Sequence, residues 1–342
     1  MKKITYNWEV LAITRFFLAI VVLFHHLPAT LMNDTSRPWY GKLGAFEAVL
    51  GFLLISGLSI GKSIQKNQDS YFKRRLQRIY PVYIVSIIIH YLVVQDQITT
   101  EFIVLLVLNL LFLNQIFTSL SYVVVAWSLS LEVWLYALAP YLYKLSFKAL
   151  MVIIYISFAA FLIHIAGRTL FHWPYYAGVS AGLNLIILGF IWVAGFVYSI
   201  YPEKRKFMAI NVALFFACYF GLTILIELFH QIKQHTAGDF VSHDLIYFAL
   251  QLLTLAIVFV VVFFNHKVTY LSLNTKKIFN VLGNISYPLY LTHRSVFVFL
   301  NKHNIHNIGL GVLASLVVAW LVYVLFDFYS KKRPLAKTPV AA

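Results

Sequence analysis

The sequence predicts an all-α integral membrane protein with about ten membrane-spanning helices and one further re-entrant or interfacial segment. Three observations predict this fold class: the composition, the length of the apolar runs and the placement of Lys and Arg. Apolar residues make up 61% of the 342 residues and charged residues only 11%, whereas soluble domains carry roughly 25% charged residues. Ten helices of about 20 residues leave room for short loops only. Any chemistry must therefore take place in or at the membrane.

Ten apolar runs have the length and composition of membrane spans. The first is too long for the apolar region of a signal peptide, and no small-residue cleavage site follows it. A single cysteine, Cys218, excludes a disulfide within the chain. The predicted spans are 11–29, 44–61, 79–94, 127–143, 149–167, 179–200, 207–229, 245–264, 279–300 and 308–328.

One further apolar run, 102–117, could be an eleventh span or a re-entrant segment. If it stays on the outer side, the loops place 20 Lys and Arg residues inside and 5 outside, with both chain termini cytoplasmic. If it crosses, every later loop changes side and the numbers become 11 and 14. Cytoplasmic loops of membrane proteins carry the excess of Lys and Arg. The ten-span topology is therefore favoured.

The net charge of +15 is explained by this asymmetry, and we expect no nucleic-acid partner. We expect one transmembrane domain with a core at about 8–330, a short basic cytoplasmic tail at 331–342 and no fused soluble domain. The predicted location is the cytoplasmic membrane, with lipid around the helices.

The longest polar interruption, 62–78, is predicted to be a basic cytoplasmic loop. Histidines of the outer loops match no metal-site spacing, so no metal is expected.

Ionisable residues within a span are costly and therefore candidates for function. Arg15 and His26 are eleven residues apart in the first span. At 100° per residue this spacing returns to within about 20° of the same helix face, about 16 Å further along the axis. His25 points about 80° away from Arg15. His26 is therefore the histidine that shares a face with Arg15.

Four titratable groups are predicted to lie in the outer half of the bilayer: His26, Glu47, Glu132 and His293. Similar depth favours one polar cavity, in which a carboxylate orients or charges an imidazole for acid–base chemistry. The alternative is a set of unrelated hydrogen bonds between packed helices. That alternative is stronger for Glu47 or His293 taken alone than for the set.

Five segments in order resemble the membrane acyltransferases of family 3. They run from the first span to the ninth, and together they are specific, although each alone is weak. The segments are Arg15 with His26, similar to Arg-x10-His; Gly51-Phe52-Leu53-Leu54-Ile55-Ser56-Gly57, similar to FFxxSG; Arg75-Leu76-Gln77-Arg78-Ile79-Tyr80-Pro81-Val82-Tyr83, similar to RxxRIxPxY; Trp127-Ser128-Leu129 with Glu132, similar to WSLxxE; and Ile285-Ser286-Tyr287-Pro288-Leu289-Tyr290-Leu291-Thr292-His293, similar to SYxxYLxH.

The resemblance implies transfer of an acyl group, most often acetyl, from cytoplasmic acyl-CoA to a carbohydrate hydroxyl on the extracytoplasmic side. Guanidinium groups match the phosphates of CoA, and the distance from Arg15 to His26 is comparable with the pantetheine arm. We expect His26 to be the general base or an acylated nucleophile, with Glu132 orienting it. The expected catalytic residues are His26, Glu132 and Arg15; the expected donor-binding residues are Arg15, Arg74, Arg75, Arg78 and Tyr83; the supporting residues are Trp127, Ser128, Glu47, Tyr287, Tyr290 and His293.

The chain departs from the family pattern at two places. Leu50 stands in the second span where the family often has an acidic residue. Glu47 lies one turn earlier on a similar face and is a candidate to substitute for it. The late acidic-x-Pro signal is only faintly echoed by Asp327 and Pro334. The rival class is a transporter or flippase for a glycan or solute, in which the same groups form a substrate pathway. No inverted repeat supports it. A third alternative is a structural or regulatory membrane subunit.

Overall fold

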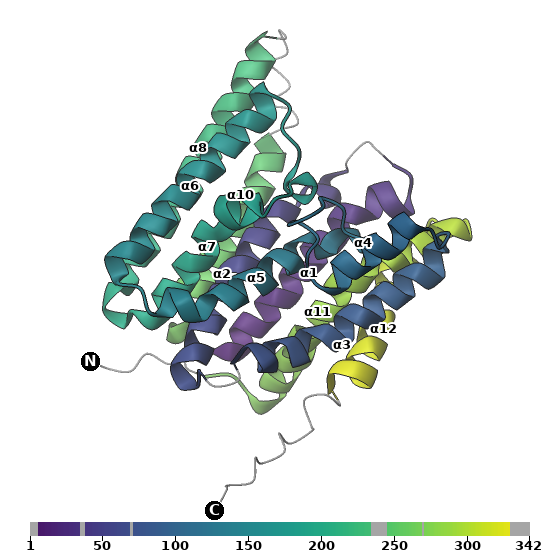
Figure 1. The fold of residues 1–342 in the computed structure, drawn as a ribbon, viewed down its shortest axis with the longest axis horizontal. Coiled ribbons are helices and arrows are strands. Elements are labelled where there is room, and N and C mark those ends of the chain that lie inside the picture. Colours follow the sequence, from purple (N-terminus) through teal and green to yellow (C-terminus); the bar gives the residue numbers. More distant parts are fainter. Residues whose placement is uncertain (1–5, 35–37, 69–70, 234–244, 269, 329–342) are drawn as a thin grey trace, which may run out of the picture.

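The computed structural model describes residues 6–34, 38–68, 71–233, 245–268 and 270–328, and within these ranges the chain is mostly helical (Figure 1). The only β contact among them is an isolated bridge between Asn114 and Thr118. The helices are α1 (Trp8–Leu31), α2 (Ala45–Lys66), α3 (Tyr71–Val94), α4 (Thr100–Leu110), α5 (Trp127–Tyr143), α6 (Phe147–Leu170), α7 (Leu183–Ile200), α8 (Arg205–Lys233), α10 (Leu245–Phe264), α11 (Leu273–Lys302) and α12 (Ile308–Val322), which continues as a π-helical turn, Tyr323–Phe328.

Polar side chains fix where several of these helices begin. Asn7, Thr99, Ser146, Ser272 and Asn307 each precede a helix and accept a hydrogen bond from a backbone N–H of its first turn. Such caps satisfy backbone donors that have no partner within the helix. The starts of α1, α4, α6, α11 and α12 are therefore set by local sequence.

Nine helices of the described chain are long and apolar enough to cross a membrane. They correspond to nine of the ten predicted spans. The tenth, α11, is 30 residues long but more polar, because Lys276, Lys277 and Arg294 lie within it. It packs along α1, where a Cβ on Gly283 would lie 2.4 Å from the Cβ of Ala12. The fold is thus an all-α polytopic membrane bundle.

The apolar run 102–117 does not form an eleventh span. Helix α4 has 11 residues and is about 16 Å long, which is half of the roughly 30 Å of a bilayer core. The turn after it is held inside the bundle by α5. Ser130 Oγ lies 2.7 Å from both Phe112 O and Asn114 O, and Trp134 Nε1 donates to Phe112 O. Irregular backbone is tolerated at membrane depth when protein side chains satisfy it in this way.

The predicted basic loop 62–78 is mostly helix, so that prediction is wrong. Helix α2 runs to Lys66 and α3 begins at Tyr71, and the connection is only 67–70. Lys, Arg and Gln are good helix formers, and the first proline of α3 comes at Pro81. The arginines of this segment are therefore held on a helix and not on a loop.

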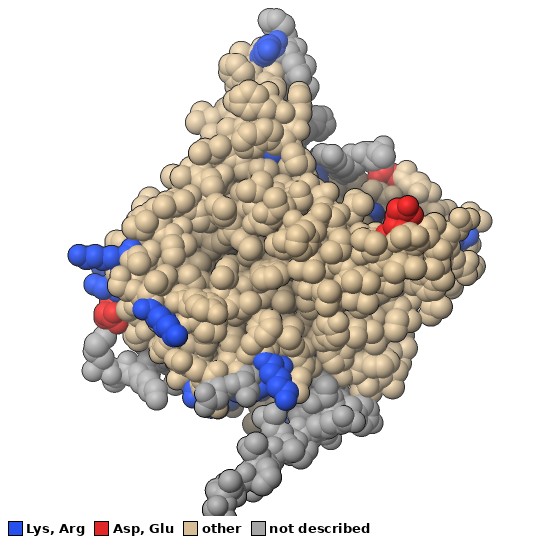
Figure 2. All heavy atoms as spheres, viewed as in Figure 1, with Lys and Arg blue, Asp and Glu red and all other residues tan. Residues whose placement is uncertain are grey.

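The loops predicted on the cytoplasmic side meet at one end of the bundle, here called the basic end. Gln65 Nε2 donates to Ile200 O, Tyr201 OH to Leu145 O and Arg205 Nη2 to Tyr6 OH. Most Lys and Arg side chains visible in Figure 2 lie along the lower and lower-left edges of this face, while its centre shows none. An uncharged middle is what a lipid-facing surface requires.

The loops predicted outside meet at the other end of the bundle, here called the distal end. Asn301 Nδ2 donates to Leu31 O, which brings the ends of α11 and α1 together. Lys302 Nζ donates to Val93 O and Val94 O at the end of α3. The start of α12 joins them, because Gly311 packs against Leu31. Helices α1 and α12 therefore run in opposite directions, and α1 begins at the end where α12 finishes.

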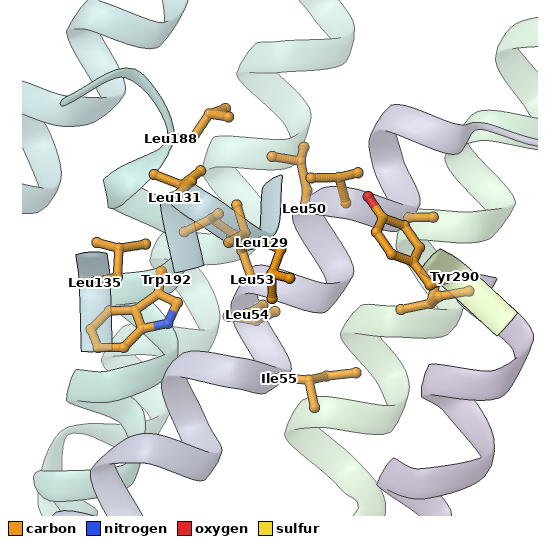
Figure 3. Packing of buried hydrophobic residues seen from close by; sticks show 14 of the residues in the cluster. Leu50, Leu53, Leu54, Ile55, Leu129, Leu131, Leu135, Leu188, Trp192 and Tyr290 are labelled. Carbon is orange, nitrogen blue, oxygen red and sulfur yellow. The ribbon is translucent and has the colours of Figure 1, made fainter. Parts of the chain in front are cut away.

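Glycines let α2 and α7 approach closely in the centre of the bundle. A Cβ on Gly57 would lie 1.9 Å from Trp192 O, and one on Gly195 would lie 2.2 Å from Leu54 O. Gly61 meets Ser199 one turn further along. Small residues four apart on facing helices are the usual means of close packing in membranes. Around this contact, leucines of α2 and α5 pack on Trp192 (Figure 3).

Candidate active site

Two histidines meet where α1 and α11 run side by side. The two helices are parallel, because Gly283 packs on Ala12 near their starts and Asn301 bonds to Leu31 near their ends. Between these contacts His293 Nε2 lies 3.2 Å from His26 Nδ1, and the ring centroids are 5.2 Å apart. His293 is fully buried, whereas His26 is partly exposed. The structure therefore gives His26 a buried imidazole as its partner.

The hydrogen bonds around this pair define the proton positions. His293 Nδ1 lies 2.9 Å from Leu289 O, a group that can only accept, so Nδ1 carries the proton and Nε2 a lone pair. His26 Nδ1 faces Val22 O at 3.0 Å and that lone pair at 3.2 Å, so it must be the donor. In a neutral imidazole the other nitrogen is then unprotonated. His26 Nε2 is thus available to accept a proton.

A cavity of about 140 Å³ lies on the basic-end side of the histidine pair, between α1, α2, α3, α5 and α11. Its lining combines three arginines, one carboxylate and several hydroxyl groups with apolar side chains. The residues that line it are Arg15, Val49, Phe52, Leu53, Ser56, Ser59, Ile60, Arg75, Arg78, Ile79, Ser128, Leu129, Glu132, Tyr136, Gly283, Asn284, Ser286, Tyr287 and Tyr290. Seven of the predicted site residues are therefore brought together here.

Glu132 is held by a hydroxyl and not by a histidine. Tyr136 OH donates to Glu132 Oε1 at 2.5 Å and lies 3.2 Å from Ser56 Oγ, to which Trp192 Nε1 also donates. The chain of contacts links α5, α2 and α7. The adjacent Ser56 and Gly57 of α2 have two separate roles in this arrangement. Ser56 joins the network of hydrogen bonds, and Gly57 lets the backbone of Trp192 approach α2.

The predicted contact between Glu132 and His26 is not made in this structure. The polar contacts of His26 are to Val22 O and His293. The depths of the two residues along their helices explain why the contact is absent. Ser128 Oγ lies 2.7 Å from Tyr290 OH, one turn before His293 on α11, and Glu132 is a further turn along α5 towards the basic end. The predicted common depth of His26 and Glu132 is thus corrected by at least one turn.

The remaining lining groups continue the series towards the basic end. Arg15 Nη2 donates to Ser59 Oγ at 3.0 Å, and its charge interacts with Glu132, Arg75 and Arg78. Polar groups therefore follow one another from Arg75 and Arg78, through Arg15, Glu132 and Ser128, to the histidine pair. We call this series the polar file.

The other predicted residues divide between the cavity and the surrounding packing. Tyr287 lines the cavity and donates to Ile79 O. Tyr83 instead donates to Asn109 O and stacks on Phe112, which fixes the re-entrant turn. Arg74 Nη2 donates to Asn67 O and does not line the cavity. Trp127 is buried with its edge against Tyr175.

Glu47 lies in a different environment from the polar file. It is buried at the start of α2, where Oε1 accepts a hydrogen bond from Tyr219 OH of α8 at 2.6 Å. Its other oxygen has no partner among the described residues. The proposed role of Glu47 as a substitute for the acidic residue at position 50 therefore has no contact that supports it.

Sequence reasoning missed several residues of this site. Tyr136 and Ser59 line the cavity and hold Glu132 and Arg15, respectively. Helical spacing could have found Tyr136, because it lies four residues after Glu132 on the same face. Ser59 could not be found this way, because its contact depends on how α2 rotates against α1. Among the described residues no group of three His, Cys, Asp or Glu side chains could hold a metal ion.

Comparison with known proteins identifies one family for nearly the whole chain. A family model described as an acyltransferase domain matches residues 10–326. Over 138 residues the chain is 32% identical to the "Putative acetyltransferase ORF330" of Acidianus two-tailed virus. That stretch covers 39% of this chain and 40% of the viral protein, so less than half of either is aligned. No solved structure matches the chain significantly.

Proposed function

The chain belongs to the acyltransferase family 3, and from this premise we propose that it is a membrane enzyme that transfers an acyl group from cytoplasmic acyl-CoA to a hydroxyl of a cell-surface or lipid-linked carbohydrate on the other side of the membrane. Acetyl is the first acyl group to test. The observation that supports this proposal best is the polar file, which leads from two arginines near the basic end to an imidazole with a free lone pair near the distal end.

The basic end of the cavity suits the donor. Acyl-CoA carries several phosphate charges on one end and a thin neutral arm on the other. Arg75 and Arg78 of α3 line the cavity, and guanidinium groups bind phosphate bidentately. From Arg15 to His26 the axial distance is about 16 Å along α1. The arm can extend along the polar file while the phosphates stay with the arginines.

The imidazole pair suits general-base catalysis of the transfer. In a direct transfer, His26 Nε2 takes the proton of the acceptor hydroxyl while that oxygen attacks the thioester carbon. The carbon–sulfur bond then breaks, and the CoA thiolate takes a proton from the His26 imidazolium. His293 accepts a hydrogen bond from His26 Nδ1 throughout, which holds the ring in the required tautomer. A second route, in which His26 is itself acylated first, uses the same atoms.

The test is the release of CoA from [14C]acetyl-CoA by the purified protein in proteoliposomes, with a carbohydrate acceptor inside. We expect His26→Ala to reduce the release at least 100-fold, because general-base catalysis contributes about 10²- to 10⁴-fold. The matched control is His25→Ala. The His25 ring packs edge-on against His26 at 5.3 Å between centroids, but its Nδ1 lies 3.0 Å from Gly41 O, whereas the hydrogen bonds of His26 are to Val22 O and His293. Its loss should therefore change the rate by less than about threefold.

The outcomes separate the competing explanations. Uptake of a glycan or solute without release of CoA would identify a transporter and contradict the proposal. Equal rates for the wild type and His26→Ala would show that the residue assignment is wrong. Labelled protein that accumulates without acceptor, and disappears when acceptor is added, would select the acyl-histidine route over direct transfer.

A further inference from the structure

Arg294 is an arginine in the half of the bundle towards the distal end, and the proposed transfer does not use it. It follows His293 directly on α11. Its Nε and Nη1 atoms are buried and have no hydrogen-bond partner among the described residues. The residue as a whole is only partly buried. A charged group in the outer half of the bundle thus has free donors.

The groups around Arg294 are imidazoles and not carboxylates. Its charge interacts with His26 and with His90, whose Nδ1 lies 3.0 Å from Ser295 Oγ. The charge of one acid, Asp96, interacts with His90 and Tyr122. The Nε and Nη1 atoms of Arg294 bond to no carboxylate among the described residues. The electrostatic environment of the histidine pair is therefore positive on this side.

An unpaired guanidinium in a span is costly, because its buried donors lose their hydrogen bonds to water. Such residues usually face a pathway or a charged ligand. The phosphates of the donor are poor candidates for this ligand. Their proposed partners, Arg75 and Arg78, line the cavity on the basic-end side of the histidine pair, and Arg294 does not line it. A transient oxyanion during transfer would compensate Arg294 only in the transition state. An anion on the bound acceptor would compensate it throughout the complex.

We propose that Arg294 binds an anionic group of the acyl acceptor, a carboxylate or a phosphate that lies beside the hydroxyl delivered to His26. This inference rests on the proposed transferase function and narrows its substrate class from any carbohydrate to an acidic one. The planar fork of Arg294 matches both anions bidentately. The anion and the hydroxyl would then be recognised by neighbouring residues, with Arg294 fixing the acceptor and His26 taking its proton.

The first measurement is binding, which does not depend on turnover. Thermal unfolding of the purified protein is followed with methyl glucoside, methyl glucuronoside and methyl glucoside 6-phosphate. We expect the two anionic probes to raise the Tm and the neutral probe to leave it unchanged. Arg294→Gln should lose the shift, whereas Arg168→Gln should keep it. Arg168 is a matched control, because it is another arginine near the distal end. It belongs to α6, and its guanidinium lies over the Tyr175 ring.

The second measurement is acetyl transfer to the same three probes. We expect Arg294→Gln to raise KM for the anionic acceptors about 10- to 100-fold, because a hydrogen-bonded charge pair contributes that much. The neutral acceptor should change less than threefold, and Arg294→Lys should retain part of the preference. The carboxylate and the phosphate probes show which of the two anions the site favours.

Three results would overturn the inference. The first is the absence of a Tm shift for both anions in the wild-type protein. The second is a shift that survives in Arg294→Gln. The third is an equal loss of kcat for charged and neutral acceptors, which would assign Arg294 to the oxyanion instead. Failure of the transferase proposal is recognised separately, because CoA release would then not depend on His26 while the binding measurement still decides the role of Arg294.

Discussion

At the residue scale, the chemistry of the site depends on which nitrogen of His26 carries the proton. Val22 O and His293 Nε2 both require a donor, so Nδ1 is protonated and Nε2 is left with its lone pair. His293 is fixed in turn by Leu289 O. The buried ring therefore has the role that a carboxylate has in the catalytic triads, which is to hold the base in one tautomer.

A substitution at His293 tests this positioning role. We expect His293→Leu to lower kcat about 10- to 100-fold, because His26 loses the acceptor that selects its tautomer. His293→Gln should restore part of the rate, since an amide oxygen can accept the same hydrogen bond. KM for acyl-CoA should change little in both variants. The measurement is steady-state CoA release, and equal rates for the Leu and Gln variants would assign His293 to packing alone.

Sequence reasoning located the residues of this site better than their contacts. The eleven-residue spacing placed Arg15 and His26 on one face, and the structure has both on the side of α1 that meets the polar file. Helix periodicity is a local property, so this prediction succeeded. The pairing of His26 with Glu132 failed, because a contact between helices depends on their relative depth and rotation. A shift of one turn, about 5.4 Å, is enough to break a hydrogen bond.

At the scale of the elements, the contact between α2 and α7 supports the cavity wall. Gly57 and Gly61 face Trp192, Phe196 and Ser199 with no space for a side chain. The same stretch of α2 presents Ser56 and Ser59 to the cavity. Close helix packing and the polar file are thus encoded in six consecutive positions, 56–61, in which the glycines face α7 and the serines face the site.

Gly57→Ala should destabilise the protein through this contact. Its Cβ would lie 1.9 Å from the backbone oxygen of Trp192, so the helices must separate. Overpacking of this kind costs about 1 to 3 kcal/mol. The matched control is Gly221→Ala in α8, where a Cβ meets nothing within 4 Å. We expect a lower Tm for Gly57→Ala in detergent at a fixed scan rate, and an unchanged or higher Tm for the control. Equal values would argue against this packing.

The boundaries of the elements show which signals the sequence contains. Hydropathy located the long helices, because lipid requires continuous apolar runs. It gave no signal for the start of α3 at Tyr71, since a helix that extends beyond the bilayer can be fully polar. It also placed the start of α7 too early. Residues 179–182 are not helical there, because the N–H groups of Ala181 and Gly182 donate to the re-entrant turn at Ile116 O and Gln115 O.

At the scale of the whole molecule, the placement of charge and the re-entrant segment determine the topology together. The eleven-span alternative required 102–117 to cross the bilayer, and α4 is too short to do so. The loops that then fall on one side do meet at the basic end. The topology remains a prediction as to which end is cytoplasmic. The proposed transfer requires the basic end to face the cytoplasm, where the donor enters. The distal end, where the acceptor binds, must then face outside.

Single cysteines can decide this orientation. Cys218 is first replaced by serine, and a cysteine is then introduced as Lys204→Cys at the basic end or as Trp173→Cys, on the loop that follows α6 at the distal end. In intact cells a membrane-impermeant maleimide should label the variant at position 173 and leave the variant at position 204 unlabelled until the membrane is permeabilised. Labelling of Lys204→Cys in intact cells would invert the bundle. The polar file would then open its arginine end away from cytoplasmic acyl-CoA, and the proposed direction of transfer would fail with it.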